Sequence, residues 1–174
     1  IGGIGPITGG AAAYGLAVKN SIQIAVDEIN AAGGINGYQI EYDTADDEHD
    51  PEKAVNAYNS LKDKGMQILL GTVTSGPCTA VEAVTAEDNM FQLTPSGSSK
   101  DCIAQANAFA VCFNDPQQGT KSAEYLAAHF ADKKIAAIYD SSDIYSSGIE
   151  TNFEAKAKEL GLEIVATEAF TQDT

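Results

Sequence analysis

The stretch QILLGTVTSGP, residues 67–77, decides the fold. Its first part, residues 67–71, is a short apolar run typical of a buried parallel strand, and its last part, residues 74–77, is a loop of hydroxyls, glycine and proline. The same arrangement recurs in MFQLTPSGS, residues 90–98, where an apolar run leads into the loop 94–98. Neither loop holds a charged side chain. Loops at the carboxyl ends of neighbouring parallel strands form the ligand crevice of an open α/β sheet, so these two loops predict a binding site.

Strand and helix patterns alternate on both sides of this stretch. Strands are expected at residues 1–5, 38–42, 67–71, 90–93 and 108–113, and helices at residues 14–32, 51–65 and 77–88. A polar, turn-like segment follows, and beyond it we expect a helix at 121–130, a strand at 134–139, a serine-rich loop at 141–147, a helix ending at 160–161 and a strand at 162–170. The alternation predicts a doubly wound parallel sheet in an N-terminal α/β lobe, residues 1–115, and the first part of a second, similar lobe, residues 116–174.

The charge balance limits the class of partner. The formal net charge is −15, from 25 acidic and 10 basic residues, and all ten basic residues are lysine. Nucleic acids and anionic membrane surfaces are not expected as partners, because both need clustered Lys or Arg. No run approaches the ~18 consecutive apolar residues of a membrane span, and no signal peptide is recognised.

Cysteine and histidine content is low. Three cysteines, Cys78, Cys102 and Cys112, leave one over if a disulfide forms. Two alternatives stay open: three buried thiols, or one disulfide in an exported protein, whose pairing the sequence does not decide. The chain has no CxxC motif and only two histidines, His49 and His129, so no metal site is expected.

Three features of the sequence could be interpreted as signs of catalysis or of a bound cofactor, and in each case the evidence is weak. The glycines at positions 3, 5 and 9 have the spacing GxGxxxG, which departs from the dinucleotide fingerprint and places Pro6 where a pyrophosphate would approach. The acidic loop at residues 43–50 has carboxylates that suit magnesium but is more simply a solvated loop over a strand end. Ser75 would need a nearby base to act as a nucleophile, and there is no GxSxG elbow. We therefore expect no cofactor, no catalytic residue and no enzymatic activity. A nucleotide-using α/β enzyme is the alternative from a different class.

Ser75 has a second interpretation. The helix expected to begin at Pro77 would direct its first N–H groups toward Ser75 and Gly76, and its dipole favours an anionic group there. In a chain without arginine, hydroxyls and backbone donors of this kind can hold a carboxylate. Ser75 can also cap its own helix, and the two roles are compatible.

Several motifs outside the two loops point to one family. They are GPITGGAAAYG at residues 5–15, AVDEINAAGGING at 25–37, DDEHDPEKAV at 46–55, DPQQG at 115–119 and DIYSSG at 143–148. Together with the loops, they resemble the type I periplasmic binding proteins of branched-chain amino-acid ABC transporters, the leucine/isoleucine/valine-binding family. The resemblance covers essentially all 174 residues.

The resemblance implies a function in solute uptake. Two α/β lobes would close on a small amino acid, branched-chain or similar, and present it to the membrane permease of an ABC importer. The protein would be a monomer outside the cytoplasm, either periplasmic or a cell-surface lipoprotein of a Gram-positive bacterium. A related ligand-sensing lobe for amides or small organic acids is the alternative among binding proteins.

The resemblance also implies the ligand contacts. The hydroxyls of Ser75 and Ser98 would hold the ligand carboxylate, and the backbone around Ser96 would bind the ammonium. Tyr14 would lie against the side-chain end, and Tyr145 would contribute from the second lobe. The complete set of expected ligand-binding residues is Tyr14, Ser75, Ser96, Gly97, Ser98 and Tyr145.

The chain departs from the family pattern in three ways. His49 and Thr74 stand where enterobacterial members carry a disulfide, so that bridge is not expected here. The acidic residue that usually answers the ammonium, and the further strands of the first lobe, belong to parts of the family pattern without a counterpart in these 174 residues. The expectation is that the chain is an N-terminal portion of a longer protein, with half of the pocket.

Overall fold

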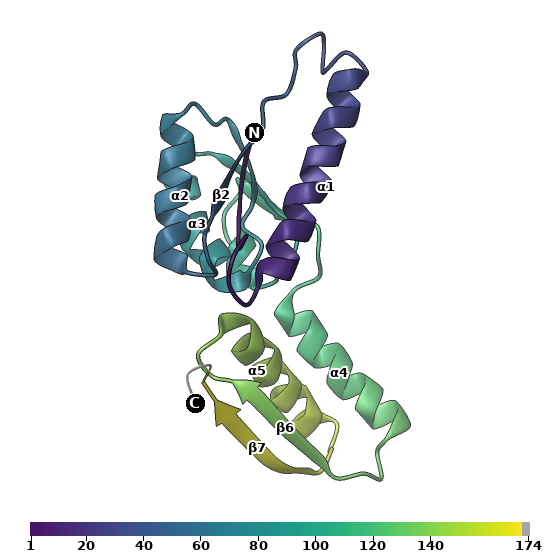
Figure 1. The fold of residues 1–174 in the computed structure, drawn as a ribbon. Coiled ribbons are helices and arrows are strands. Elements are labelled where there is room, and N and C mark those ends of the chain that lie inside the picture. The colour runs from purple at the N-terminus through teal and green to yellow at the C-terminus, as the bar shows by residue number, and fades with distance from the viewer. Residues whose placement is uncertain (172–174) are drawn as a thin grey trace. The chain divides into compact units, whose positions relative to one another are not determined.

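The computed structural model describes residues 1–171, which form two compact units (Figure 1). The first unit comprises residues 1–97 and 101–112, and the second comprises residues 98–100 and 113 onward. Each unit has its own parallel sheet, with five strands in the first and two in the second. No helix in this described part of the chain combines the length and the apolar character needed to cross a membrane.

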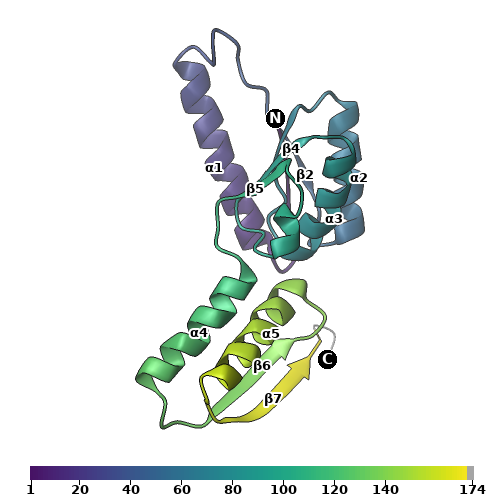
Figure 2. The ribbon, with the colours of Figure 1, turned by 180° about the vertical axis from the view of Figure 1, so that it is seen from behind.

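The first unit is a five-stranded parallel sheet in the order β2-β1-β3-β4-β5. Its strands are β1 (Gly2–Gly5), β2 (Asp43–Asp46), β3 (Ile68–Gly71), β4 (Phe91–Thr94) and β5 (Ala108–Ala110). Helix α1 (Ala12–Ala31) covers one face of the sheet, and α2 (Pro51–Asp63) and α3 (Ser75–Glu87) cover the other (Figure 2). This arrangement confirms the predicted doubly wound parallel sheet.

The core of the first unit joins the sheet to α2 and α3. Ile4 of β1 and Leu69 of β3 are buried there with Tyr58 and Leu61 of α2 and Val81 of α3. Burying side chains of this size contributes about 1.5–3 kcal/mol each, which makes this cluster the main source of stability for the unit.

The second strand lies later than the sequence predicts. Residues 38–42 were expected to form it, but β2 begins at Asp43, which pairs with Gly2 of β1. Asn30 of α1 holds the segment before β2, because its side-chain amide donates to the carbonyl of Ile40 at 2.9 Å and its side-chain oxygen accepts from the N–H of Ile40 at 2.7 Å. The backbone of Ile40 is therefore engaged by a helix side chain instead of by β1.

The second unit is a parallel pair of strands, β6 (Ile135–Asp140) and β7 (Ile164–Phe170), with two helices. The helices are α4 (Asp115–His129) and α5 (Ile144–Glu159), and they pack closely against each other. Gly119 allows this approach, because a Cβ added there would lie 2.3 Å from the carbonyl oxygen of Ile149. The two strands do not bury both of their faces, since Ile138 is 74% exposed and Val165 is 52% exposed.

Both helices of the second unit begin earlier than the sequence predicts. The segment 114–119 was expected to be a turn and α4 to begin near residue 121, but α4 begins at Asp115. Asn114 forms a capping box with Gln117: its side chain accepts from the Gln117 N–H at 3.0 Å, and its own N–H donates to Oε1 of Gln117 at 3.1 Å. Likewise Asp143 caps α5 by accepting from the N–H groups of Tyr145 and Ser146, so the serine-rich segment is partly helical.

Candidate functional site

The candidate site lies at the carboxyl edge of the first sheet. Strand order places β2 on one side of β1 and β3 on the other, so the winding direction reverses between β1 and β3. The loops that follow β1 and β3 turn to opposite faces of the sheet at this reversal, and hydrogen bonds join the loop after β4 to the loop after β3. This is the position where open α/β sheets bind ligands. Both loops that the sequence singles out therefore lie at this edge.

Ser75 lies at the start of α3 but does not cap it. It is the first helical residue and is only 3% exposed, while Thr74 holds the cap position with extended backbone angles. The expectation that Ser75 caps its own helix is therefore wrong. The side chain of Thr74 makes no capping hydrogen bond, because its Oγ1 lies 2.9 Å from Nδ1 of His49. The cap side chain thus supplies no acceptor to the N-terminus of α3, where the helix dipole favours an anionic group.

His49 and Thr74 stand at the two positions where enterobacterial members of the family carry a disulfide, and here they contact each other. Their side chains meet at 2.9 Å, so a hydrogen bond joins the acidic loop after β2 to the loop after β3. The two loops are tied together at this position without a covalent bridge.

A buried hydroxyl clamps the loop after β4 to the loop after β3. Thr94, which is fully buried, donates from Oγ1 to the carbonyl of Thr72 at 2.7 Å and accepts from the N–H of Gly97 at 2.8 Å. Ser96 adds a second link, because its Oγ donates to the carbonyl of Val73 at 2.6 Å. Sequence reasoning missed Thr94. A threonine at a strand end followed three residues later by glycine was the available signal, since such hydroxyls accept from nearby backbone N–H groups.

Gly97 is required by its surroundings. A Cβ added there would lie 2.7 Å from Oγ1 of Thr94 and 2.9 Å from Sγ of Cys78, both of which are buried. The glycine lets the loop backbone lie directly against α3. The hydroxyl of Ser96 is engaged with the carbonyl of Val73 in this arrangement.

Asp46 of β2 holds the loop that follows β1. It accepts from the N–H of Ile7 at 2.7 Å and from the hydroxyl of Thr8 at 2.6 Å, and it also accepts from the N–H of Glu48 at 2.9 Å. Burial raises the pKa of Asp46, but the hydrogen bonds from Thr8, Ile7 and Glu48 outweigh it and hold the pKa below its ordinary value. The carboxylate is thus ionised and fixes the loop that leads into α1.

The acidic loop gives no support to the magnesium reading. Asp43 pairs with Lys64 at 2.8 Å, Glu48 pairs with Lys53 at 2.6 Å, and Asp46 is engaged as above. Across residues 1–171, no group of three or more His, Cys, Asp or Glu side chains is placed to hold a metal ion.

Asp47 is the unusual carboxyl of this edge. It is fully buried, its Oδ1 accepts from the N–H of His49 at 2.9 Å, and its Oδ2 has no hydrogen-bond partner. Burial raises the pKa of Asp47 to about 6. Asp47 therefore makes the stability of the first unit depend on pH.

Tyr14 lies in the first turns of α1, directly after the loop that follows β1. Its side chain is 67% exposed, so its ring is accessible to a ligand at the carboxyl edge. Four of the expected ligand residues therefore belong to the first unit, and they lie on α1, on α3 and in the loop after β4: Tyr14, Ser75, Ser96 and Gly97.

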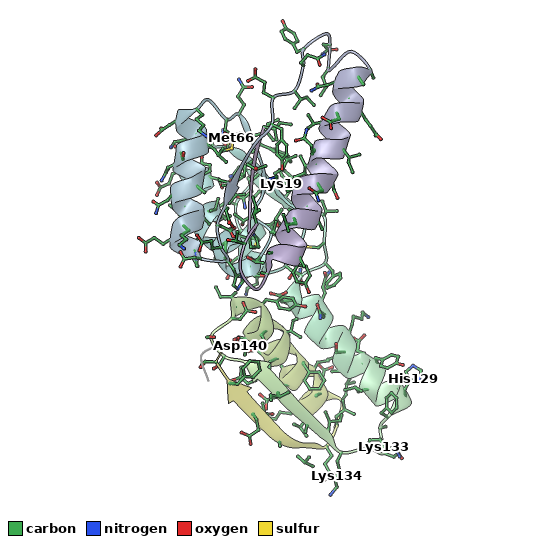
Figure 3. The ribbon with its side chains drawn as sticks, in the orientation of Figure 1. Lys19, Met66, His129, Lys133, Lys134 and Asp140 are labelled. Atoms are coloured by element: carbon green, nitrogen blue, oxygen red, sulfur yellow. The ribbon has the colours of Figure 1, made fainter. Side chains whose placement is uncertain are left out.

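Ser98 and Tyr145 belong to the second unit. The backbone oxygen of Ser98 accepts from the N–H of Asp115 at 2.8 Å, and Tyr145 lies in the first turn of α5, where its hydroxyl accepts from Nε2 of Gln118 at 3.5 Å. Asp140 lies at the carboxyl end of β6 beside the start of α5 (Figure 3), and its N–H donates to Oγ of Ser146 at 3.0 Å. Tyr145, the one residue expected from the second lobe, thus lies at a helix N-terminus of the second unit, whereas Ser98, expected in the first lobe, belongs to the second unit.

The comparisons with known proteins agree with this architecture. The family model described as periplasmic binding protein matches residues 1–174. The Leu/Ile/Val-binding protein BraC3 of Rhizobium johnstonii is 37% identical over 173 residues, which are 98% of this chain and 47% of that protein.

Two solved structures give the same result. One is the branched-chain amino acid transporter substrate-binding protein LivJ of Streptococcus pneumoniae in complex with isoleucine. It superposes with a TM-score of 0.89 at 31% identity, and the superposition covers 99% of this chain and 49% of LivJ. The leucine-binding protein LivK of Thermotoga maritima superposes with a TM-score of 0.88 at 25% identity, again over 99% of this chain and 49% of that one.

The loops after β3 and β4, which hold hydroxyls and no charged side chain, lie at the edge where doubly wound sheets bind ligands. With the family match over the whole chain, the chain belongs to the type I periplasmic binding proteins of the branched-chain amino-acid group. It spans about half the length of the relatives it matches.

Proposed function

We propose that this chain forms part of an extracytoplasmic solute receptor that delivers a small amino acid, branched-chain or similar, to the permease of an ABC importer. The observation that carries the proposal is the pair of loops after β3 and β4, which hold hydroxyls and no charged side chain, with Ser75 at the start of α3 and the second loop clamped by Thr94. Relatives named for Leu, Ile and Val binding supply the ligand class. The receptor performs no chemistry in this proposal.

The proposed ligand pose follows from the donors and acceptors at this edge. The ligand carboxylate accepts from the hydroxyl of Ser75 and from the N-terminus of α3, whose dipole favours negative charge. The ammonium donates to backbone carbonyls of the loop around Ser96 and Gly97. Tyr14 covers the apolar end of the ligand. Charge-assisted hydrogen bonds of this kind are stronger than neutral ones, so they fix the amino-acid end whatever the side chain.

The second lobe completes the site in this proposal. Ser98 would add a hydroxyl to the carboxylate, and Tyr145 would contact the ligand when the lobes close. A ligand that contacts both lobes stabilises the closed form over the open one by its differential affinity, and the permease would recognise that closed form. The receptor would act as a monomer.

Isothermal titration calorimetry on the full-length protein tests the proposal. Leucine, isoleucine and valine are titrated into the wild type, Ser75→Ala and the control Ser60→Ala, in which an exposed serine of α2 is changed. We expect Ser75→Ala to lose about 1–3 kcal/mol of binding free energy, because a charge-assisted hydrogen bond is removed. We expect Ser60→Ala to bind as the wild type does.

Three results would contradict the proposal. Equal affinity in the wild type and Ser75→Ala would remove Ser75 from the site. Binding of a short-chain acid or amide without binding of any amino acid would favour the sensor alternative. Stabilisation by NAD or ATP, with no response to amino acids, would favour a nucleotide-using enzyme.

A further inference from the structure

Two cysteines that lie far apart in the sequence meet beneath the candidate site. Cys78 lies in the first turns of α3, Cys102 lies in the 3₁₀ helix η1 (Lys100–Ile103), and both are fully buried. The Sγ of Cys102 lies 3.9 Å from the carbonyl oxygen of Ser75 and 4.0 Å from Oγ1 of Thr79. Residues 75, 78 and 79 share one face of α3, because residues three and four apart are neighbours on a helix. The thiol of Cys102 therefore packs against the helix face that carries Cys78.

The thiols of Cys78 and Cys102 are neighbours on this helix face. They are joined by a side-chain hydrogen bond, and this bond lowers the pKa of Cys78 despite its burial. Nε2 of Gln92 also donates to Sγ of Cys78 at 3.5 Å.

Cys112 has a different environment. It is half-buried, and its Sγ donates to the carbonyl oxygen of Gly97 at 3.5 Å. It therefore lies against the loop after β4, which Cys78 approaches from α3. Of the three pairs that three cysteines allow, only the pair of Cys78 with Cys102 has two fully buried members that are neighbours.

We propose that Cys78 and Cys102 are a disulfide-forming pair that ties the start of α3 to the segment after the β4 loop. The oxidant is a disulfide, either a small molecule or a protein, met before the two residues are buried by folding. The thiolate of Cys78 attacks one sulfur of the oxidant, which forms a mixed disulfide and releases one thiolate. The thiolate of Cys102 then attacks Sγ of Cys78 and releases the second thiolate. Two cysteine thiols are oxidised, and one external disulfide is reduced to two thiols.

The cross-link would restrain the two segments that form the candidate site. Cys78 is three residues after Ser75, and Cys102 follows the loop that contains Gly97. A covalent bond between them restrains both segments that the ligand carboxylate and ammonium contact under the proposed function. The inference goes beyond that function, and its test needs no ligand.

Redox equilibration followed by mass spectrometry tests the pairing. The full chain is refolded from denaturant in excess oxidised glutathione, denatured again without reductant and alkylated with iodoacetamide. Trypsin alone leaves Cys102 and Cys112 in one peptide, residues 101–121, so chymotrypsin is added to separate them by cleavage after Phe109. We expect a cross-linked peptide pair that contains Cys78 and Cys102, with Cys112 alkylated.

Thermal unfolding with and without reductant gives a second readout. Reduction of the oxidised chain is expected to lower Tm by about 10 °C, because the bond closes a loop of roughly 25 residues. The control Cys112→Ser should keep both the cross-link and the shift, and Cys102→Ser should lose both. Three alkylated cysteines after oxidation, or a cross-link that includes Cys112, would overturn the proposal, and both results come from the wild-type chain.

Discussion

Replacing Thr94 by valine removes one buried hydroxyl and keeps the branched shape of the side chain. The hydroxyl donates to the carbonyl of Thr72 at 2.7 Å and accepts from the N–H of Gly97 at 2.8 Å. The variant loses both hydrogen bonds and leaves the Gly97 N–H and the Thr72 carbonyl without that partner. At about 1 kcal/mol for each hydrogen bond, plus the penalty for desolvated backbone groups, we expect a loss of about 2–4 kcal/mol in the free energy of unfolding.

Urea denaturation followed by circular dichroism measures this loss. Thr94→Ser is the matched control, because it keeps the hydroxyl and removes only one methyl group, at a cost of about 1 kcal/mol. The valine variant should therefore unfold at a clearly lower urea concentration than the serine variant. If the two variants unfold at the same urea concentration, the hydroxyl does not clamp the loops and the account of this edge is wrong.

Two further predictions concern Asp47 and Gly97. The pKa of Asp47 is raised to about 6 in the folded chain, so the wild type loses stability as pH rises from about 4 to about 6. The variant Asp47→Asn lacks this titration, so its free energy of unfolding should rise by about 2–3 kcal/mol relative to that of the wild type between pH 4 and pH 7. Equal pH slopes of the two proteins in urea melts would contradict this. Gly97→Ala should cost about 1–3 kcal/mol, because its Cβ would press on Thr94 and Cys78. Gly10→Ala is the control, since a Cβ at Gly10 meets nothing within 4 Å, and a thermal melt in which both variants match the wild type would refute the crowding argument.

The sheet of the first unit could be predicted from the sequence because its signals are local. The apolar runs before the loops at residues 74–77 and 94–98 form β3 and β4, and Asp50 with Pro51 starts α2 as their residue types indicate. The parallel alternation of strands and helices then follows, because each βα unit buries its own apolar face. The edge of the sheet where the site lies is fixed by the same alternation.

One error in the predicted elements arises where a side chain engages the backbone of a distant segment. Asn30 holds Ile40, which is ten residues away, and no periodicity within residues 38–42 reveals that bond. The start of α4 was missed for a different reason, since the capping box of Asn114 and Gln117 is a local signal that was interpreted as a turn. Thr94 was missed because one of its partners, Thr72, meets it only when β3 and β4 lie side by side.

The positions of the expected ligand-binding residues are observed, whereas their contacts with a ligand are predicted. Ser75, Ser96 and Gly97 lie at the carboxyl edge of the first sheet, and Tyr14 is exposed at the start of α1. Their roles toward a ligand remain predictions that came from the family resemblance. Residue types alone indicated an uncharged crevice, because hydroxyls and glycines identify a binding loop but not which ligand atom each group meets.

Mass spectrometry of the ligand that co-purifies with the full-length protein tests the central claim most directly. The protein is purified without added amino acids, denatured, and the released small molecules are identified. The account predicts leucine, isoleucine, valine or a closely related amino acid in near-stoichiometric amount. Recovery of a nucleotide or an aromatic acid in that amount, with no amino acid, would contradict it.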